Sequence, residues 1–329
     1  MPDPNDHFDG RRYFNPNGAN GQPFWKVPRL LITKKTQWPR EVPVQPRRPS
    51  APRPDDVIVT FVGHSTFLIQ TPVANALIDP VYADRAGPLP FTGPRRVRPP
   101  GVRLDDLPPI SLVLLSHNHY DHCDLGTLKL LARRFHPMVV TPPGNGRLLR
   151  AVGLSKIEEL DWWERSRIAP LPVTVTPAQH FSARTPFDRN RALWGGFLIE
   201  VNGRRIFHAG DSGYGPHFRQ IGERLGPIDL ALLSIGAYEP RWFMKDVHLN
   251  PAEAVQAHLE LGARQSVAMH FGTFQLTPEG IDQPVRDLGV ALQDRGVPTE
   301  RFRILEVGES LPVVATRAAA SGSSLTRPG

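Results

Sequence analysis

Cysteine is almost absent from this chain, because Cys123 is the only one among 329 residues. No intrachain disulfide can form, and a metal site would have to draw its ligands mainly from histidine and carboxylate side chains. The composition therefore carries no sign of an oxidising compartment.

Long apolar runs are also missing. No stretch reaches the ~18 apolar residues that a membrane-spanning helix needs. Residues 1–6 contain neither the basic region nor the apolar region of a secretory signal. We expect a cytoplasmic protein, and peripheral contact at the inner membrane surface stays open.

An acidic excess is missing as well. Lys and Arg together number 39 and Asp and Glu 32, which gives a formal net charge of +7 at pH 7. A positive excess suits an anionic partner such as a phosphate ester, a lipid headgroup surface or nucleic acid. Charge alone does not choose among these partners.

Composition at the two ends separates a central domain from its flanks. Residues 1–55 are rich in Pro, Asn, Gly and Arg and show no regular period, which predicts an extended N-terminal arm. Residues 316–329 are small, polar and Ser-rich, which predicts a disordered tail. Residues 56–315 are long enough to bury a large core, and we expect one large domain there.

Strand and helix signals alternate within this domain. A hairpin is predicted over residues 57–70 and 75–78, and Asn202-Gly203 predicts a second hairpin between residues 193–200 and 204–208. Apolar runs that predict buried strands cover residues 110–115, 171–176, 230–233 and 266–269. Helical spacing covers residues 125–135, and Asn250, Pro251 and Glu253 predict a capped helix start. The pattern predicts an α/β or α+β fold with two sheets.

The stretch SHNHYDH, residues 116–122, directly follows one of the predicted strands. Alternate residues of an extended segment share a face, so His117 and His119 can point the same way, with Asp121 and His122 just beyond. Four unpaired titratable groups at the end of a buried strand would be costly without a partner. They are also more ligands than one tetrahedral ion needs once later strands contribute, so two metal ions are predicted.

Three further polar side chains stand where apolar strands end. His180 follows residues 171–176, Asp211 follows residues 204–208, and His270 follows residues 266–269. Together with the first four, they would complete a dinuclear site of seven ligands.

The H-x-H-x-D-H pattern with a separated His, Asp and His resembles the metallo-β-lactamase fold superfamily of dinuclear zinc hydrolases. Longer stretches resemble the N-acyl-phosphatidylethanolamine-hydrolysing phospholipase D family. These stretches are GHST (63–66), SHNHYDHCD (116–124), LWGGF (193–197), HAGDSGYG (208–215), IGAYEPRWFMKDVHLNPAEAV (235–255) and VAMHFGTF (267–274). The long block at 235–255 is more specific than the metal motif.

The resemblance implies a four-layer αβ/βα sandwich, in which two mixed β-sheets are flanked by helices and the site lies at one edge between the sheets. It implies two Zn²⁺ ions per chain with a bridging water or hydroxide, whose pKa the paired cations lower towards neutrality. Under this resemblance His117, His119 and His180 hold one ion, Asp121, His122 and His270 hold the second, and Asp211 bridges both.

Three other residues are secondary candidates. His248 is a candidate for binding phosphate or protonating the leaving oxygen, and an inert, exposed histidine is the alternative. His64 is a candidate for orienting a ligand carboxylate, and a capping or turn role is the alternative. Asp124 either anchors a ligand imidazole or caps the helix predicted from residue 125.

The resemblance implies a zinc-dependent phosphodiester hydrolase of phospholipase D type, which cleaves N-acyl-phosphatidylethanolamine to N-acylethanolamine and phosphatidate. A metal-dependent hydrolase of a lactone, a cyclic phosphodiester or RNA is the alternative, and a non-catalytic zinc scaffold is a third reading. RNA is disfavoured because no module interleaves aromatic and basic residues. A scaffold is disfavoured because structural zinc sites are closed. The oligomeric state is not fixed by the sequence.

Overall fold

The computed structural model describes residues 6–19, 21–22, 24–26, 28–29, 32–33 and 35–315. The tail predicted at residues 316–329 lies outside the described residues, as do residues 1–5 of the predicted arm.

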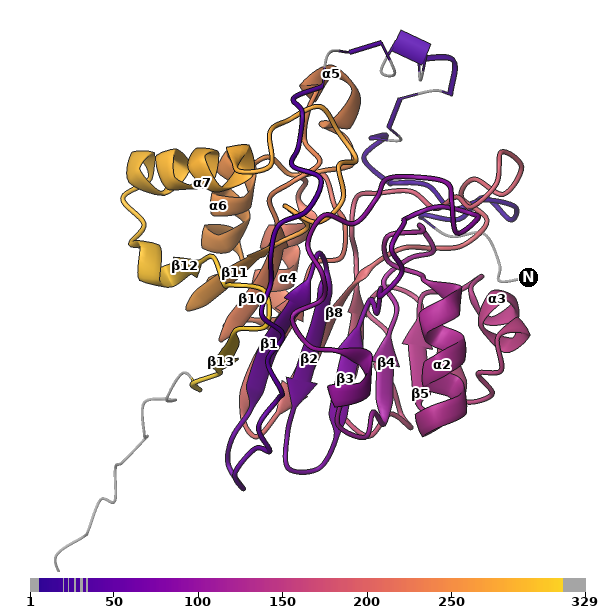
Figure 1. Ribbon diagram of the computed structural model, residues 1–329, viewed down its shortest axis with the longest axis vertical. Helices are drawn as coiled ribbons and strands as arrows, with labels where there is room; N and C mark the ends of the chain where they lie inside the picture. Colours follow the sequence, from indigo (N-terminus) through magenta and orange to yellow (C-terminus); the bar gives the residue numbers. More distant parts are fainter. Residues whose placement is uncertain are drawn as a thin grey trace, which may run out of the picture.

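Two mixed β-sheets form the centre of the molecule (Figure 1). The seven-stranded sheet has the order β13-β1-β2-β3-β4-β5-β6 and the six-stranded sheet the order β12-β11-β10-β9-β8-β7. The strands of the first sheet are β1 (Ile58–Gly63), β2 (Thr66–Gln70), β3 (Asn75–Ile78), β4 (Leu112–Leu114), β5 (Met138–Thr141), β6 (Ile157–Glu159) and β13 (Ser310–Pro312). Those of the second are β7 (Val173–Thr176), β8 (Gly196–Val201), β9 (Arg204–His208), β10 (Leu230–Ser234), β11 (Gln265–Met269) and β12 (Phe302–Arg303).

Helices cover the outer faces of both sheets. In Figure 1, α2 (Leu125–Phe135) and α3 (Gly146–Ala151) lie beside the first sheet, and α6 (Pro251–Glu260) and α7 (Gln283–Asp294) lie beside the second. The other helices whose bounds fall within the described residues are α4 (His217–Leu225), α5 (Arg241–Met244), η1 (Phe24–Lys26), η2 (Leu104–Asp106) and η3 (Thr299–Arg301). The predicted fold of two mixed sheets flanked by helices is thereby confirmed. No helix in the described part of the chain has both the length and the apolar character needed to cross a membrane.

Alternating side chains of the first sheet fill two separate cores. Phe67 and Ile69 of β2 pack into the core between the sheets, whereas Leu68 packs with Leu128 and Leu131 of α2 on the outer side. Side chains alternate across a strand, so this sheet is covered on both faces and its strands read as continuous apolar runs.

The candidate metal ligands lie just beyond the carboxyl ends of parallel strands. Strands β3, β4, β5 and β6 are mutually parallel, and so are β9, β10, β11 and β12. The carboxyl ends of parallel strands meet at one edge of a sheet, and ligands bind outside that edge. The segments that follow β4, β9 and β11 carry the histidine motif, Asp211 and His270.

Local signals account for most of these element boundaries. Asp124 caps α2 by accepting from the N–H groups of Gly126 and Thr127, so the capping alternative for Asp124 is confirmed. Asn250 and Glu253 form a capping box at the start of α6, as predicted. The first predicted hairpin is β1 and β2 with β3 added antiparallel, and a register shift between Phe61 and Gly63 interrupts the β1–β2 pairing.

Candidate metal centre

Three imidazoles converge on one point. Nε2 of His117 lies 2.9 Å from Nδ1 of His119, which lies 3.2 Å from Nε2 of His180. Zinc holds imidazole nitrogens at about 2.0–2.1 Å in a tetrahedron, which places two ligand atoms roughly 3.3 Å apart. The three nitrogens are therefore spaced to hold one ion.

A second group lies beside the first. Oδ2 of Asp121 is 3.3 Å from Nε2 of His270 and 3.7 Å from Nε2 of His122. His122 and His270 are fully buried, and the side chain of Asp121 is 11% exposed. This group can hold a second ion by the same spacing argument.

The carboxylate of Asp211 lies between the two groups. Its Oδ2 is 3.1 Å from Nε2 of His270 and 3.2 Å from Nε2 of His122. The same oxygen is 3.8 Å from Nε2 of His180 and 4.0 Å from Nε2 of His117. One carboxylate therefore reaches both groups. The structure thus brings together the seven side chains that the sequence singled out.

Several buried polar atoms of this cluster are left without a hydrogen-bond partner among the residues that the structure describes. They include Nε2 of His122, Nε2 of His270 and Oδ1 of Asp211. A buried polar atom without a partner costs free energy, and native structures rarely leave such atoms together. A cation at this point would satisfy all three atoms, so the donor set fits a metal ion.

The outward nitrogens of the imidazoles are held by other groups. Nδ1 of His122 donates to Oδ2 of Asp79 at 2.8 Å, and Nδ1 of His117 donates to Oγ of Ser116 at 2.9 Å. Asp79 in turn accepts from Ser116, at 2.8 Å from N–H and 2.6 Å from Oγ. Nδ1 of His180 donates to the carbonyl of Val247 at 2.8 Å. This hydrogen-bond pattern places the proton of a neutral ring on Nδ1. Nε2 of His117 and of His180 therefore has a free lone pair facing the centre, and so has Nε2 of His122 once its ring is neutral.

Protonation favours metal binding in the three-histidine group. Burial lowers the pKa of His117 well below its ordinary value, that of His119 to about 3 and that of His180 to about 4. Loss of hydration disfavours the charged imidazolium, so all three rings are neutral at pH 7. Neutral imidazole is the form that binds metals.

In the group formed by Asp121, His122 and His270, nearby carboxylates outweigh burial and favour protonated histidine. Burial disfavours a charge on His270, but the carboxylates of Asp211 and Asp121 outweigh it and raise the pKa of His270 to about 9. Burial also opposes ionisation of Asp211, yet the charges on His122 and His270 keep its pKa well below the ordinary value. Two carboxylates here attract positive charge, from protons or from a metal ion.

The secondary candidates also lie at the centre. His64 places Nε2 3.1 Å from Oδ2 of Asp121, as expected for a group that orients a carboxylate. His248 is 7% exposed, with Nδ1 3.9 Å from Oδ2 of Asp211, so the alternative of an exposed histidine is wrong. It lies within the short segment between α5 and α6, where its carbonyl accepts from Arg241.

Sequence reasoning missed Asp79. This fully buried carboxylate follows β3 directly, with a backbone φ of 41°. The signal was present, since Asp79 is a carboxylate at the end of an apolar strand, like Asp211. The predicted ligand set was already complete without it.

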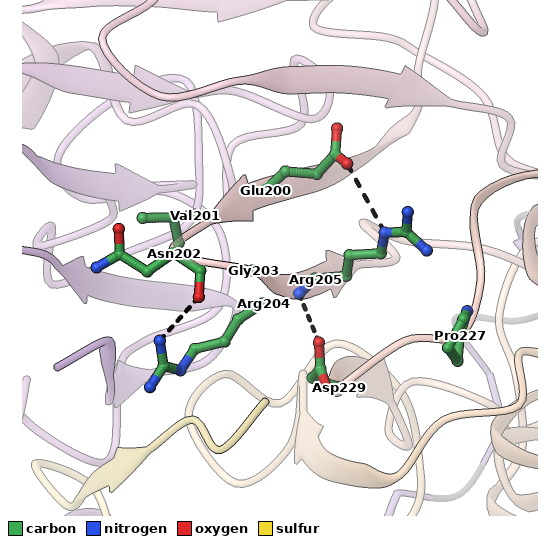
Figure 2. A pocket seen from close by; sticks show the side chains of 8 residues that line it. All are labelled: Glu200, Val201, Asn202, Gly203, Arg204, Arg205, Pro227 and Asp229. Atoms are coloured by element: carbon green, nitrogen blue, oxygen red, sulfur yellow. Dashed lines mark hydrogen bonds and ion pairs between the residues drawn. The ribbon is translucent and has the colours of Figure 1, made fainter. Parts of the chain in front are cut away.

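A separate hollow of about 460 Å³ lies at the β8–β9 turn (Figure 2). Strand β9 runs from this turn towards His208, so the hollow and the histidine cluster are at opposite ends of the strand. Its charged residues contact one another: Nε of Arg205 is 3.7 Å from Glu200, and the backbone N–H of Arg205 donates to the carboxylate of Asp229. No histidine lines it, so it is not part of the candidate metal centre.

Comparisons with known proteins give matches in both sequence and fold. Residues 74–271 match the family described as "Beta-lactamase superfamily domain". The chain is 39% identical over 231 residues to N-acyl-phosphatidylethanolamine-hydrolyzing phospholipase D 1 of Caenorhabditis elegans, a match that covers 67% of this chain and 65% of the relative. It is 35% identical over 258 residues to a mitochondrial protein of the same designation from Saccharomyces cerevisiae, covering 76% of this chain and 55% of the relative. The matched region thus spans less than two thirds of these relatives' length.

Among solved structures, the metallo hydrolase Igni18 of the archaeon Ignicoccus hospitalis has the same fold. It aligns with a TM-score of 0.59 at 24% identity and covers 79% of this chain and 100% of that one. The family match and the two-sheet architecture lead to the same conclusion: this chain belongs to the beta-lactamase superfamily, and proteins designated N-acyl-phosphatidylethanolamine-hydrolyzing phospholipase D are among its homologues.

Proposed function

We propose that this protein is a dinuclear zinc-dependent phosphodiesterase of phospholipase D type, which hydrolyses N-acyl-phosphatidylethanolamine to N-acylethanolamine and phosphatidate. The observation that carries the proposal is the position of Oδ2 of Asp211, within 4.0 Å of ring nitrogens in both groups of the cluster. The designations of the two relatives support the substrate class.

The ligand assignment keeps the two groups separate. His117, His119 and His180 would hold one ion, Asp121, His122 and His270 the other, and Asp211 both. Imidazole and carboxylate donors without thiolate suit Zn²⁺. Cys123 lies directly beside His122, but it is fully buried and burial raises the pKa of its thiol to about 12, so it stays a neutral thiol. When bound, two zinc ions would supply a water of lowered pKa and positive charge for the phosphoryl oxygens.

The chain's own residues orient the ligand side chains and leave one side of the site accessible. Asp79, Ser116, Val247 and His64 hold ligand side chains in one orientation through their outer atoms. His119 is the one imidazole of the three-histidine group that is only partly buried. We therefore propose that the phosphodiester enters from the side of His119.

His248 is the group proposed to act on the substrate itself. Its Nδ1 is buried, lacks a hydrogen-bond partner among the described residues and lies beside Asp211. In this position it can donate a hydrogen bond to a phosphoryl oxygen, or donate a proton to the ethanolamine oxygen as the bond from phosphorus to that oxygen breaks.

Part of the arm is suited to contact a lipid surface. Trp25 in η1 is 77% exposed and Ile32 is 83% exposed. The guanidinium of Arg29 lies 4.6 Å from the ring centre of Trp242, which places this part of the arm on α5. Exposed apolar side chains beside cations bind anionic lipid surfaces, so we propose that the protein works at the inner membrane surface of the cytoplasm.

The proposed activity can be tested with a panel of substrates. Protein freed of metal with chelator, and the same protein reloaded with zinc, would be given N-acyl-phosphatidylethanolamine, an aryl phosphodiester, a lactone and RNA. Product release would be followed by mass spectrometry. The proposal predicts zinc-dependent release of N-acylethanolamine and phosphatidate.

Two results would contradict the proposal in different ways. Turnover of the lactone or of RNA without release of N-acylethanolamine would be consistent with the proposed metal centre but would contradict the proposed substrate. Turnover of none of the four by zinc-loaded protein would contradict the phosphodiesterase assignment altogether. A His248→Gln variant with unchanged turnover would remove His248 from the proposed role.

A further inference from the structure

The N-terminal arm is built into the core beside the ligand His180. Phe8 and Tyr13 are each 4% exposed and pack with Leu193, Trp194 and Ala178. The Tyr13 N–H donates to the carbonyl of Asn190 at 2.8 Å. This part of the arm therefore lies on the segment between β7 and β8, which carries His180.

Asn15 bonds both backbone polar groups of His180. Its Oδ1 accepts from the His180 N–H at 3.2 Å, and its Nδ2 donates to the His180 carbonyl at 2.9 Å. The side chain of Asn15 also donates to the carbonyl of Ala19 at 2.6 Å. Asn15 is 3% exposed, so these bonds are shielded from water and fix the peptide groups on both sides of His180.

Neighbouring arm residues hold the surroundings of the same ligand. Asn17 bonds the side chain of Gln179, which donates to the carbonyl of Asp246 at 2.8 Å. A Cβ added to Gly21 would lie 3.1 Å from Cγ1 of Val247, so the arm packs against the residue whose carbonyl accepts from Nδ1 of His180. Backbone and ring of His180 are thus both positioned next to the arm.

The location of His180 explains why this support matters. His180 lies four residues beyond the end of β7, so the ladder of the sheet no longer fixes its backbone. A ligand must be held to within about half an ångström to keep its metal geometry. Both of the backbone hydrogen-bonding groups of His180 are instead held by a side chain 165 positions earlier in the sequence.

We infer that Asn15 is a positioning residue of the metal centre and that the arm is a structural part of that centre, specifically of the group formed by His117, His119 and His180. This inference rests on the proposed two-ion site. Groups that orient metal ligands typically change metal affinity by about 10–100-fold when removed. Loss of Asn15 should therefore lower the affinity for the ion held by His117, His119 and His180. It should leave the ion held by Asp121, His122 and His270 in place.

The test compares two buried asparagines. Asn145 is 0% exposed and bonds Thr141 and the carbonyl of Pro142, so Asn145→Ala removes a similarly buried carboxamide without touching a proposed ligand. Wild type, Asn15→Ala and Asn145→Ala would be dialysed against buffers of fixed free zinc concentration. Zinc per chain would be measured by mass spectrometry, and folding would be checked by circular dichroism.

The inference predicts that Asn15→Ala retains one zinc ion at a free zinc concentration at which wild type and Asn145→Ala retain two, with the affinity for the lost ion reduced about 10–100-fold. Two ions bound with wild-type affinity by folded Asn15→Ala would overturn it, as would loss of both ions together. Fewer than two ions in the wild type would instead contradict the two-ion site and the inference with it. If Asn15→Ala does not fold, Asn15→Asp, which loses the donor to the His180 carbonyl, is measured with the same predicted and contradicting results.

Discussion

Oδ2 of Asp79 lies 2.8 Å from Nδ1 of His122, and both side chains are fully buried although they come from different strand ends. Asp79 also accepts twice from Ser116, so one carboxylate holds the orientation of His122 and the start of the histidine motif. Replacing Asp79 should lower the affinity for the ion held by Asp121, His122 and His270 more than it lowers the stability of the fold.

The first prediction therefore concerns Asp79. Asp79→Asn keeps an oxygen that can accept from His122 but removes the charge, whereas Asp79→Ala removes both. We expect zinc affinity at the second group to fall about 10–100-fold in Asp79→Ala and less in Asp79→Asn. Zinc titration of both variants checks this order, and equal affinity in wild type and Asp79→Ala would refute the role of Asp79.

The second prediction concerns Asp211. Asp211→Asn has nearly the same shape but lacks the negative charge that lies beside His122 and His270. We expect it to lose most phosphodiesterase activity while the circular dichroism spectrum stays close to that of wild type. Metal content and turnover of the same preparation are the measurement. Near-normal turnover with two bound zinc ions would show that the bridging assignment is wrong.

The third prediction concerns His7, for which the sequence suggested no role. Its ring stacks on Trp162 at 4.3 Å, and Nε2 lies 2.7 Å from Asp161. Burial disfavours the charged ring, but hydrogen bonds to Asp161 and Asp6 outweigh burial and raise the pKa of His7. A raised folded-state pKa contributes stability that is fully present below about pH 6.5 and is lost as pH rises through the raised value.

Thermal unfolding of wild type and His7→Ala across pH 5–9 therefore isolates the contribution of a charged His7 to stability. We expect the difference in melting temperature between wild type and His7→Ala to be largest at the acidic end and to shrink as pH rises. A difference that stays constant or grows towards alkaline pH would contradict a charged His7 as the anchor of the arm.

The fourth prediction concerns the capping box of α6. Oδ1 of Asn250 accepts from the Glu253 N–H at 2.8 Å, and Glu253 pairs with Arg241, which also donates to the His248 carbonyl. Asn250→Ala should lower the free energy of unfolding by about 0.5–2 kcal/mol, the usual range for a lost N-cap. Chemical unfolding in urea measures this difference, and unchanged stability would mean that the cap is not required.

The sequence predicted those parts of the site that depend on local order. Asp211 and His270 follow apolar strands, and the parallel arrangement of such strands brings their ends to one edge. The N-cap of α6 and the Asn202-Gly203 turn were also predicted, because their signals lie within a few residues.

The contacts that the sequence did not predict join distant segments. Asn15 and His180 are 165 positions apart, and their pairing depends on how the arm packs on the segment after β7. A Pro-rich and Asn-rich stretch without a period predicts an extended arm, but its composition does not indicate which surface the arm covers. Helix α7 was likewise not assigned to any element, although Leu288 and Leu292 lie on its buried face.

The central claim is that two metal ions lie within one cluster of seven side chains and share Asp211. Crystals grown from zinc-loaded protein and measured on both sides of the zinc absorption edge would locate the ions directly. The account predicts two anomalous peaks about 3.5–4 Å apart, one beside His117, His119 and His180 and one beside Asp121, His122 and His270. A single peak, or zinc bound away from Asp211, would contradict it.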